Sequence, residues 1–136
     1  MSEIENIWKI KIGQTAELTT VVDTTNTANA VKSGLLDVFA TPMMIALMEN
    51  AADDCISQNL QADESTVGVI VNIKHFRASG LGKEIKAQAE VVEVNKNKVK
   101  FKVVAYDNDG EIGKGEHQRA IINIPKFLKR LEDKIN

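Results

Sequence analysis

One segment of the chain carries an apolar pattern with helical spacing. After Thr41-Pro42, apolar side chains recur every three or four residues up to about position 59. Two neighbouring i, i+4 rows form one broad apolar face: Met43, Leu47, Ala51 and Cys55, and Met44, Met48, Ala52 and Ile56. Thr is a favoured N-cap, and Pro at the first helical position loses only an amide without an intrahelical partner. The sequence therefore predicts a helix that begins at Thr41-Pro42, ends between Asn59 and Gln61, and buries one face.

Most of the remaining chain alternates apolar and polar positions, which is typical of half-buried strands. A first strand is predicted at 16–22, before the helix, and no structure can be assigned to residues 31–39. Three runs after the helix alternate, and their apolar sets are predicted to face the helix. These sets are Val67, Val69, Val71 and Ile73; Ile85, Ala87, Ala89 and Val91; and Val99, Phe101, Val103 and Ala105.

The turn signals connect these strands into an antiparallel order. Clusters of turn-forming residues at 95–97 and 107–110 predict two hairpins. A last strand is predicted from about 111 to 124, and Pro125 stops it and opens a short amphipathic helix with apolar residues at 127, 128 and 131. One helix can cover one face of such a sheet, whereas the Lys, Gln and Glu positions of the other face tolerate water. We therefore expect an α+β fold in a single domain over residues 1–136.

Composition and charge limit the class of protein. The chain is 43% hydrophobic and 26% charged, which is ordinary for a globular protein, and its net charge of −2 disfavours a nucleic-acid partner. The single cysteine, Cys55, excludes an internal disulfide and any multi-cysteine metal site. No apolar run is long enough to cross a membrane, and acidic residues within Met1–Asn6 argue against a signal peptide. A cytoplasmic location is expected.

Two polar residues occupy positions where an apolar residue would be usual. Glu49 falls at the flank of the helix's apolar face, where partial burial would make its carboxylate a stronger base or nucleophile. The alternative is a boundary glutamate whose carboxylate reaches water. His75 continues the row that ends with Ile73, so its imidazole is predicted to point inward at the end of a strand. The alternative is a core histidine whose hydrogen bonds are made by a backbone carbonyl.

Thr41 has a structural and a chemical interpretation. As an N-cap, its hydroxyl would accept a hydrogen bond from the amide of Met43 or Met44. Alternatively, the first turn of the helix could stabilise a carbonyl oxygen that gains negative charge, with these two amides or the Thr41 hydroxyl as donors. Thr41 and Glu49 are about 12 Å apart along a helix axis, so a substrate would have to lie between them.

Other polar or reactive residues are weaker candidates. Cys55 lies in the middle of the apolar helix face, which indicates a small core residue rather than a nucleophile. His117 and Arg119 share one strand face with Ile121, and they either form a polar patch that points inward or are exposed to solvent.

Three segments together resemble the hotdog-fold thioesterases, and within them the fluoroacetyl-CoA thioesterase branch. The segments are Val38 to Glu49 (VFATPMMIALME), Thr66 to His75, and Gly113 to Ala120 (GKGEHQRA). They occur in the order and with nearly the spacing of that branch, within a resemblance that extends from about Gly34 to Phe127. The resemblance implies a curved antiparallel sheet wrapped around one long central helix, and two subunits that pair to build acyl-CoA sites.

The resemblance also assigns roles to individual residues. The branch's catalytic threonine, glutamate and histidine match Thr41, Glu49 and His75. The predicted substrate-binding residues are Leu35, Phe39, Met43, Met44, Gly68 and Arg119. Leu35 stands where the fluoroacetyl-specific enzyme has a phenylalanine over the acyl pocket, so the resemblance implies thioester hydrolysis but not fluoroacetyl specificity.

The resulting hypothesis is a homodimer, or a dimer of dimers, that hydrolyses small or medium acyl-CoA thioesters without a metal or other cofactor. Glu49 would attack the carbonyl or activate a water, and His75 would transfer protons. Two alternatives on the same fold remain, namely a non-catalytic module that binds acyl-CoA or another small ligand, and an enoyl-CoA hydratase.

Overall fold

A computed structural model describes residues 9–135 of the chain. Residues 1–8, which include the acidic segment discussed above, and residue 136 lie outside the described part. The elements within it are β1 (Thr15–Val21), α1 (Ala28–Val31), α2 (Thr41–Ser57), β2 (Glu64–His75), β3 (Glu84–Asn95), β4 (Lys98–Asp107), β5 (Gly110–Asn123) and α3 (Ile124–Ile135).

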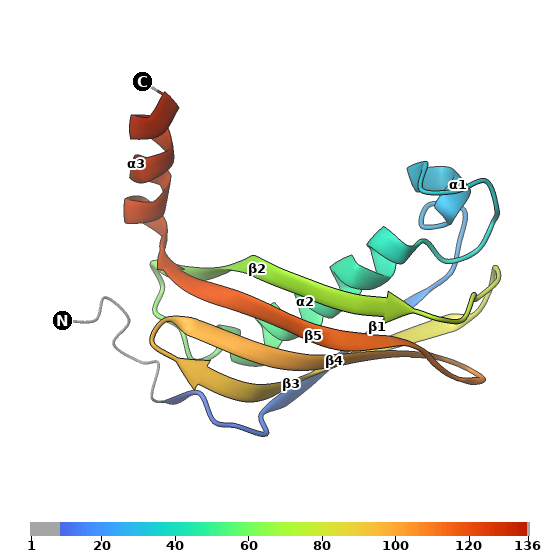
Figure 1. Cartoon of the computed structure of the whole chain (residues 1–136), viewed down its shortest axis with the longest axis horizontal. Coiled ribbons are helices and arrows are strands. Elements are labelled where there is room, and N and C mark those ends of the chain that lie inside the picture. The colour runs from blue at the N-terminus through green and yellow to red at the C-terminus, as the bar shows by residue number, and fades with distance from the viewer. Residues whose placement is uncertain (1–8, 136) are drawn as a thin grey trace.

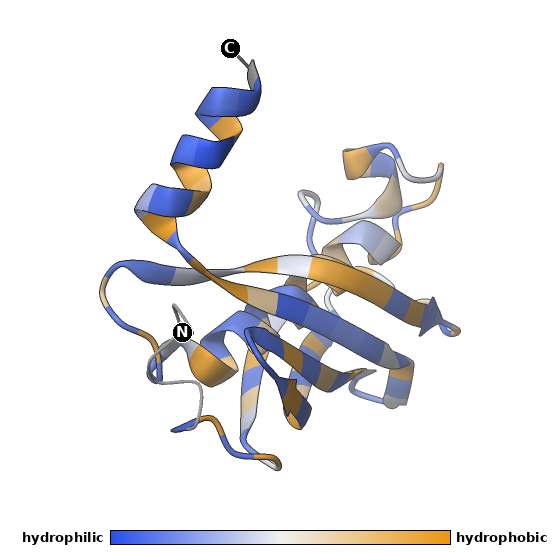
Figure 2. Cartoon of the chain, turned by 60° about the vertical axis from the view of Figure 1, so that its left-hand side comes forward, coloured by the Kyte–Doolittle hydropathy of each residue, from blue (hydrophilic) through white to orange (hydrophobic). Residues whose placement is uncertain are grey.

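The five strands form one antiparallel sheet in the order β1-β3-β4-β5-β2, with β1 and β2 at its edges (Figure 1). The sheet is curved, and α2 lies along its inner face, where it packs mainly across β3 and β1. The predicted α+β class, with a curved sheet around one long helix, is therefore confirmed. β5 leads directly into α3, which projects away from the sheet (Figures 1 and 2). Within residues 9–135, no helix combines the length and apolar character required to span a membrane.

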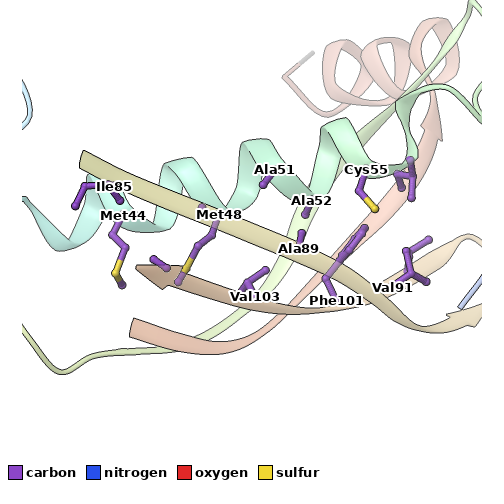
Figure 3. Close-up of a cluster of buried hydrophobic side chains, with 14 of the residues drawn as sticks. Met44, Met48, Ala51, Ala52, Cys55, Ile85, Ala89, Val91, Phe101 and Val103 are labelled. Carbon is purple, nitrogen blue, oxygen red and sulfur yellow. The ribbon is translucent and has the colours of Figure 1, made fainter. Parts of the chain in front are cut away.

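The core lies between α2 and the inner face of the sheet (Figure 3). The residues that α2 buries completely or nearly so are Met44, Met48, Ala51, Ala52, Cys55 and Ile56. The inward sets predicted on β3 and β4 are fully buried, from Ile85 to Val91 and from Val99 to Ala105. Each large apolar side chain removed from water contributes about 1.5–3 kcal/mol to folding. The small side chains of buried alanines on both α2 and β3 allow the helix to approach the sheet closely.

The N-terminus of α2 differs from the prediction by one residue. Ala40, not Thr41, is the N-cap, and Thr41 and Pro42 are the first two helical residues. The amides of Met43 and Met44 both donate to the Ala40 carbonyl, at 3.0 Å each. The expectation that the Thr41 hydroxyl caps these amides is therefore wrong, because the backbone already satisfies them.

The single turn of α1 lies just before the segment 31–39 that the sequence left unassigned, and shares only Val31 with it. The Thr27 hydroxyl accepts a hydrogen bond from the Ala30 amide at 3.1 Å and so caps the turn. Lys32 ends it in the left-handed conformation, with a φ of 62°. The loop then returns to the body of the molecule, where Phe39 pairs with Thr27.

Strand β2 contains a β-bulge that the alternation did not predict. The pairing of β2 with β5 shifts between Gly68 and Ile70, which leaves Val69 as an additional residue. One extra residue reverses the faces of all subsequent side chains. The prediction that Val67 and Val69 face the helix is accordingly wrong, and Val69 is 48% exposed.

Because of the bulge, even-numbered residues before it and odd-numbered residues after it both face α2. Before it, Thr66 is buried and bonds to Asp53 of α2, and a Cβ on Gly68 would lie 2.8 Å from Glu49 Oε2. After it, Ile73 packs on the core and His75 reaches the start of α2, as predicted.

We expect replacement of Gly115 by alanine to weaken the β2–β5 pairing. Gly115 is paired with Ile73, and a Cβ there would collide with the Asn72 carbonyl and lie 2.7 Å from the Ile73 Cα. Because the obstacle is backbone, Gly115→Ala should lower the free energy of unfolding by about 1–3 kcal/mol in urea titrations. The matched control is Gly80→Ala, since a Cβ there would meet no atom within 4 Å. Equal stabilities of the two variants would contradict this interpretation.

Candidate active site

Thr41 and His75 form a hydrogen-bonded pair where the start of α2 meets the end of β2. The Thr41 Oγ1 atom lies 2.7 Å from His75 Nδ1. The other ring nitrogen, Nε2, is buried and has no hydrogen-bond partner among residues 9–135. Burial lowers the pKa of His75 below its ordinary value, so the imidazole is neutral at pH 7 and able to accept or pass on a proton.

A cavity of about 280 Å³ adjoins this pair. Its lining residues are Ala28, Ser33, Val38, Phe39, Thr41, His75, Phe76, Arg77 and Ala78. A second cavity of about 180 Å³ also includes Phe39 in its lining, together with Met43 and Leu47. A further depression, of about 420 Å³, is on the outer face of the sheet beside Glu17 and Tyr106 and contains none of the predicted site residues.

The predicted acyl pocket is only partly assembled. Phe39 lines both cavities near α2, and Met43 lines the smaller one. Met44, in contrast, is fully buried in the core, where its side chain fills the space in front of Gly113. Leu35 is 91% exposed at the tip of the loop after α1 and lines none of these cavities.

Glu49 occupies a different part of the α2–β2 contact. It lies two turns beyond Thr41, about 12 Å along the helix axis. Its side chain is 37% exposed, and its Oε2 atom is 3.6 Å from the Arg119 Nη1 atom. Within one chain, the structure therefore brings Thr41 and His75 together and places Glu49 beside Gly68 and Arg119 instead.

Arg119 is buried in a polar cluster beneath Glu49. Its Nε donates to the Thr66 hydroxyl at 2.7 Å, and its Nη2 donates to the Thr66 carbonyl at 3.2 Å. Its Nη1 lies 3.1 Å from His117 Nε2, and His117 Nδ1 lies 2.7 Å from the Ile70 carbonyl. Of the two alternatives for His117 and Arg119, the inward polar patch is confirmed. Sequence reasoning attached no role to His117 or Thr66. The available signal for His117 was that it shares a strand face with Arg119, whereas the predicted alternation gave none for Thr66.

The helix N-terminus offers fewer donors than expected. The amides of Met43 and Met44 are already bonded to the Ala40 carbonyl, and Pro42 has no amide hydrogen. Of the donors considered from the sequence, the Thr41 hydroxyl is the one left to bind a substrate carbonyl. No group of three or more potential metal ligands from His, Cys, Asp and Glu gathers anywhere in residues 9–135.

Cys55 takes no part in this site. Its side chain is buried against the sheet, and burial raises the pKa of its thiol to about 11. A thiol held in its neutral form is a poor nucleophile, so the prediction of a core role is confirmed.

Comparisons with known proteins identify the family of the chain. The profile of the fluoroacetyl-CoA-specific thioesterase family matches residues 22–125. The chain belongs to this family. The fluoroacetyl-CoA thioesterase of Streptantibioticus cattleyicolor is 33% identical over 98 residues, which cover 72% of this chain and 70% of the relative. The predicted family is thereby confirmed.

Solved structures extend the similarity to the fold. A crystal structure of the fluoroacetyl-CoA thioesterase FlK superposes with a TM-score of 0.87 at 27% identity, over 92% of this chain and 97% of that one. A thioesterase superfamily member from Thermus thermophilus superposes at 0.83 with 28% identity, over 92% and 95%. A hot-dog-like protein from Thermanaerovibrio acidaminovorans reaches 0.89 over 98% of both chains at 19% identity, which supports the fold alone.

The two histidines predict how stability depends on pH. Burial lowers the pKa of both His75 and His117 below 6.5, so below that pH the unfolded chain binds more protons than the folded one. Stability should therefore be complete above pH 6.5 and decline as the pH falls toward the folded-state pKa values. Urea titrations at pH 7.5 and 5.5 measure this decline, and histidine NMR titrations should give midpoints below 6.5. Midpoints at or above 6.5 would show that the rings are hydrated.

Proposed function

We propose that this chain is a homodimeric acyl-CoA thioesterase that hydrolyses small or medium acyl thioesters to a carboxylate and a free thiol. The observation that carries the proposal is the Thr41–His75 pair beside a cavity, in a chain of the fluoroacetyl-CoA-specific thioesterase family. A crystal structure of a FlK variant with fluoroacetate and CoA supports the substrate class. That chain is 28% identical to this one, and the match covers 87% of this chain and 99% of that one. Gly68 and Arg119, which lie beside Glu49, are proposed to contact the acyl group.

The pair can stabilise the charge that develops on the thioester oxygen. With substrate bound, the Thr41 hydroxyl donates to that oxygen and accepts a hydrogen bond from the His75 Nδ1–H. The thioester carbon is attacked, and the carbon–sulfur bond breaks. The departing thiolate takes up the proton that the hydrolysing water loses, passed on through His75 Nε2, so Glu49 and the imidazole both return to their starting protonation states. A preorganised donor at the position where charge develops lowers the barrier, because it needs no reorganisation during the reaction.

Glu49 supplies the oxygen nucleophile, either by removing a proton from water or by direct attack followed by hydrolysis of the anhydride. In one chain it is too far along α2 to act on a thioester held by Thr41. A second chain could bring Glu49 to that thioester by pairing along strand β2, which is at an edge of the sheet. Three consecutive apolar residues of β2 are about half exposed: Val69 (48%), Ile70 (47%) and Val71 (47%). Such an apolar edge favours pairing with another strand.

A second copy of β2 is the proposed partner of this edge. Antiparallel pairing centred between Val71 and Asn72 would set Gly68 opposite the partner's His75. Since Glu49 contacts Gly68, each carboxylate would then lie next to the partner's Thr41–His75 pair. A two-fold axis would create two equivalent sites, each built from both chains.

Removal of the catalytic groups should abolish turnover without unfolding the protein. We expect Glu49→Gln and His75→Ala each to lower kcat by about 100-fold or more, as is typical for loss of acid–base catalysis. A thiol reagent can follow hydrolysis of acetyl-, butyryl- and hexanoyl-CoA, and Cys55 should add little background because it is buried. The matched control is Glu93→Gln on the outer face. Thermal stabilisation by acyl-CoA without thiol release would instead indicate a binding module, and hydration of an enoyl-CoA without thiol release a hydratase.

Mixed dimers test whether a site needs both chains. When inactive Glu49→Gln and His75→Ala chains are reassorted, half of the dimers carry one complete site, so roughly a quarter of wild-type activity should return. The control mixture of Thr41→Ala and His75→Ala chains should recover nothing, because both residues come from the same chain. Failure of the first mixture, with mixed dimers verified by mass spectrometry, would place the whole site in one chain.

A further inference from the structure

His117 is a fully buried titratable residue to which the proposed chemistry gives no role. It lies on the inner face of β5, and its ring is stacked against Phe101 of β4, with centroids 6.4 Å apart. Both ring nitrogens have partners from different elements. They connect the backbone of β2 just after the bulge to the guanidinium of Arg119.

These two contacts define the protonation state of the ring. The Ile70 carbonyl can only accept, so His117 Nδ1, at 2.7 Å, carries a hydrogen. The Arg119 Nη1 atom can only donate, so His117 Nε2, at 3.1 Å, carries none. The neutral Nδ1–H tautomer satisfies both contacts. A second proton on Nε2 would face the guanidinium directly, and the charged groups that face this ring are Arg119 and Glu49.

The orientation of the Arg119 guanidinium is fixed by acceptors on two residues, Thr66 and His117. Thr66 receives its Nε and Nη2 hydrogens, while His117 receives a hydrogen from Nη1. This Nη1 atom is also the one that faces Glu49 Oε2 at 3.6 Å. The acceptor on His117 therefore determines where the positive charge next to Glu49 lies.

Gly68 of β2 lies next to Glu49, His117 and Arg119. A Cβ at this position would lie 2.8 Å from Glu49 Oε2, 3.4 Å from His117 Cε1 and 3.6 Å from Arg119 Nη1. The absence of a side chain leaves room for the carboxylate against the strand. Glu49 is thus confined between bare backbone and the Arg119 guanidinium.

We propose that His117 is a positioning residue, whose neutral imidazole orients the Arg119 guanidinium and through it fixes Glu49 for attack or for activation of water. This role rests on the proposed thioesterase function, because it concerns the carboxylate of that same site. His117 itself touches no substrate and transfers no proton. Its effect should therefore appear in kcat rather than in KM.

Two conservative substitutions separate this role from a structural one. In His117→Gln the side-chain oxygen can reach the position of Nε2 and accept from Arg119, whereas the bond to Ile70 is lost. In His117→Asn the amide can reach the position of Nδ1 and donate to Ile70, whereas the acceptor for Arg119 is lost. We expect His117→Asn to lower kcat for acetyl-CoA by about 10-fold with KM changed less than about 2-fold, and His117→Gln to keep at least about a third of wild-type kcat. If His117 instead acts mainly by holding the bulge through Ile70, His117→Gln should lower kcat more than His117→Asn.

A double-mutant cycle identifies the residue through which His117 acts. If it acts through Arg119, His117→Asn should cause no further loss of kcat in an Arg119→Lys background, because the two changes remove the same interaction. Val103→Ala, a core truncation on β4, controls for lower stability and should keep wild-type kcat. Additive losses in the cycle, or equal kcat for His117→Asn and the wild type, would overturn the inference.

The test distinguishes this inference from the proposed function on which it rests. A wild-type protein that releases no thiol from any acyl-CoA would refute the thioesterase function. An active wild type whose His117→Asn variant is unimpaired would refute the positioning role alone. Nitrogen-15 NMR of the wild-type ring should show the neutral Nδ1–H tautomer, and a protonated or Nε2–H ring at pH 7 would overturn the inference in either case.

Discussion

The β-bulge at Val69 is the constraint on which the site depends. Side chains along a regular strand alternate between faces, so Gly68 and His75, which differ by an odd number of positions, would lie on opposite faces of β2. The extra residue brings both toward α2. Glu49 can then lie beside Gly68, and His75 at the end of the strand can meet Thr41. The first carbonyl after the bulge, that of Ile70, is bonded to His117, so the irregularity is held by the buried polar cluster.

That cluster places a charged group inside an otherwise apolar core, which is costly unless every polar atom has a partner. Arg119 meets this condition through Thr66, His117 and Glu49, and Thr66 in turn bonds to Asp53 of α2. The cluster therefore links α2, β2 and β5 by directional contacts, which alanines and valines at the same positions could not provide. Fully satisfied networks of this kind fix one arrangement of their elements. Here the arrangement that they fix includes the position of the carboxylate.

Most of the fold could be predicted from the sequence, because helix α2 and strands β3 and β4 follow local periodicities that need no knowledge of the rest of the chain. The bulge could not, since it is a property of the pairing between β2 and β5, and Val69 is as apolar as its neighbours. Local pattern could not decide between capping and a chemical role for the Thr41 hydroxyl for the same reason: its partner, His75, is distant in sequence. The polar role of His117 required knowing that its face is buried. The family resemblance implied Thr41, Glu49 and His75 together as catalytic residues, but no local pattern shows that within one chain Glu49 lies apart from the other two.

The separation of the acid and the imidazole has a consequence for how the site could be completed. Both groups lie beside β2, Glu49 next to Gly68 in its first half and His75 at its last residue, and this strand is at an edge of the sheet. Antiparallel pairing of two copies of β2 has two-fold symmetry. If it brings Glu49 of one copy to His75 of the other, it also brings Glu49 of the second copy to His75 of the first. A single chain would need α2 to bend sharply, which its buried face against β3 and β1 opposes. The rigidity of the helix–sheet core therefore supports the proposed dimer, rather than bending of one chain, as the way for Glu49 to meet a Thr41–His75 pair.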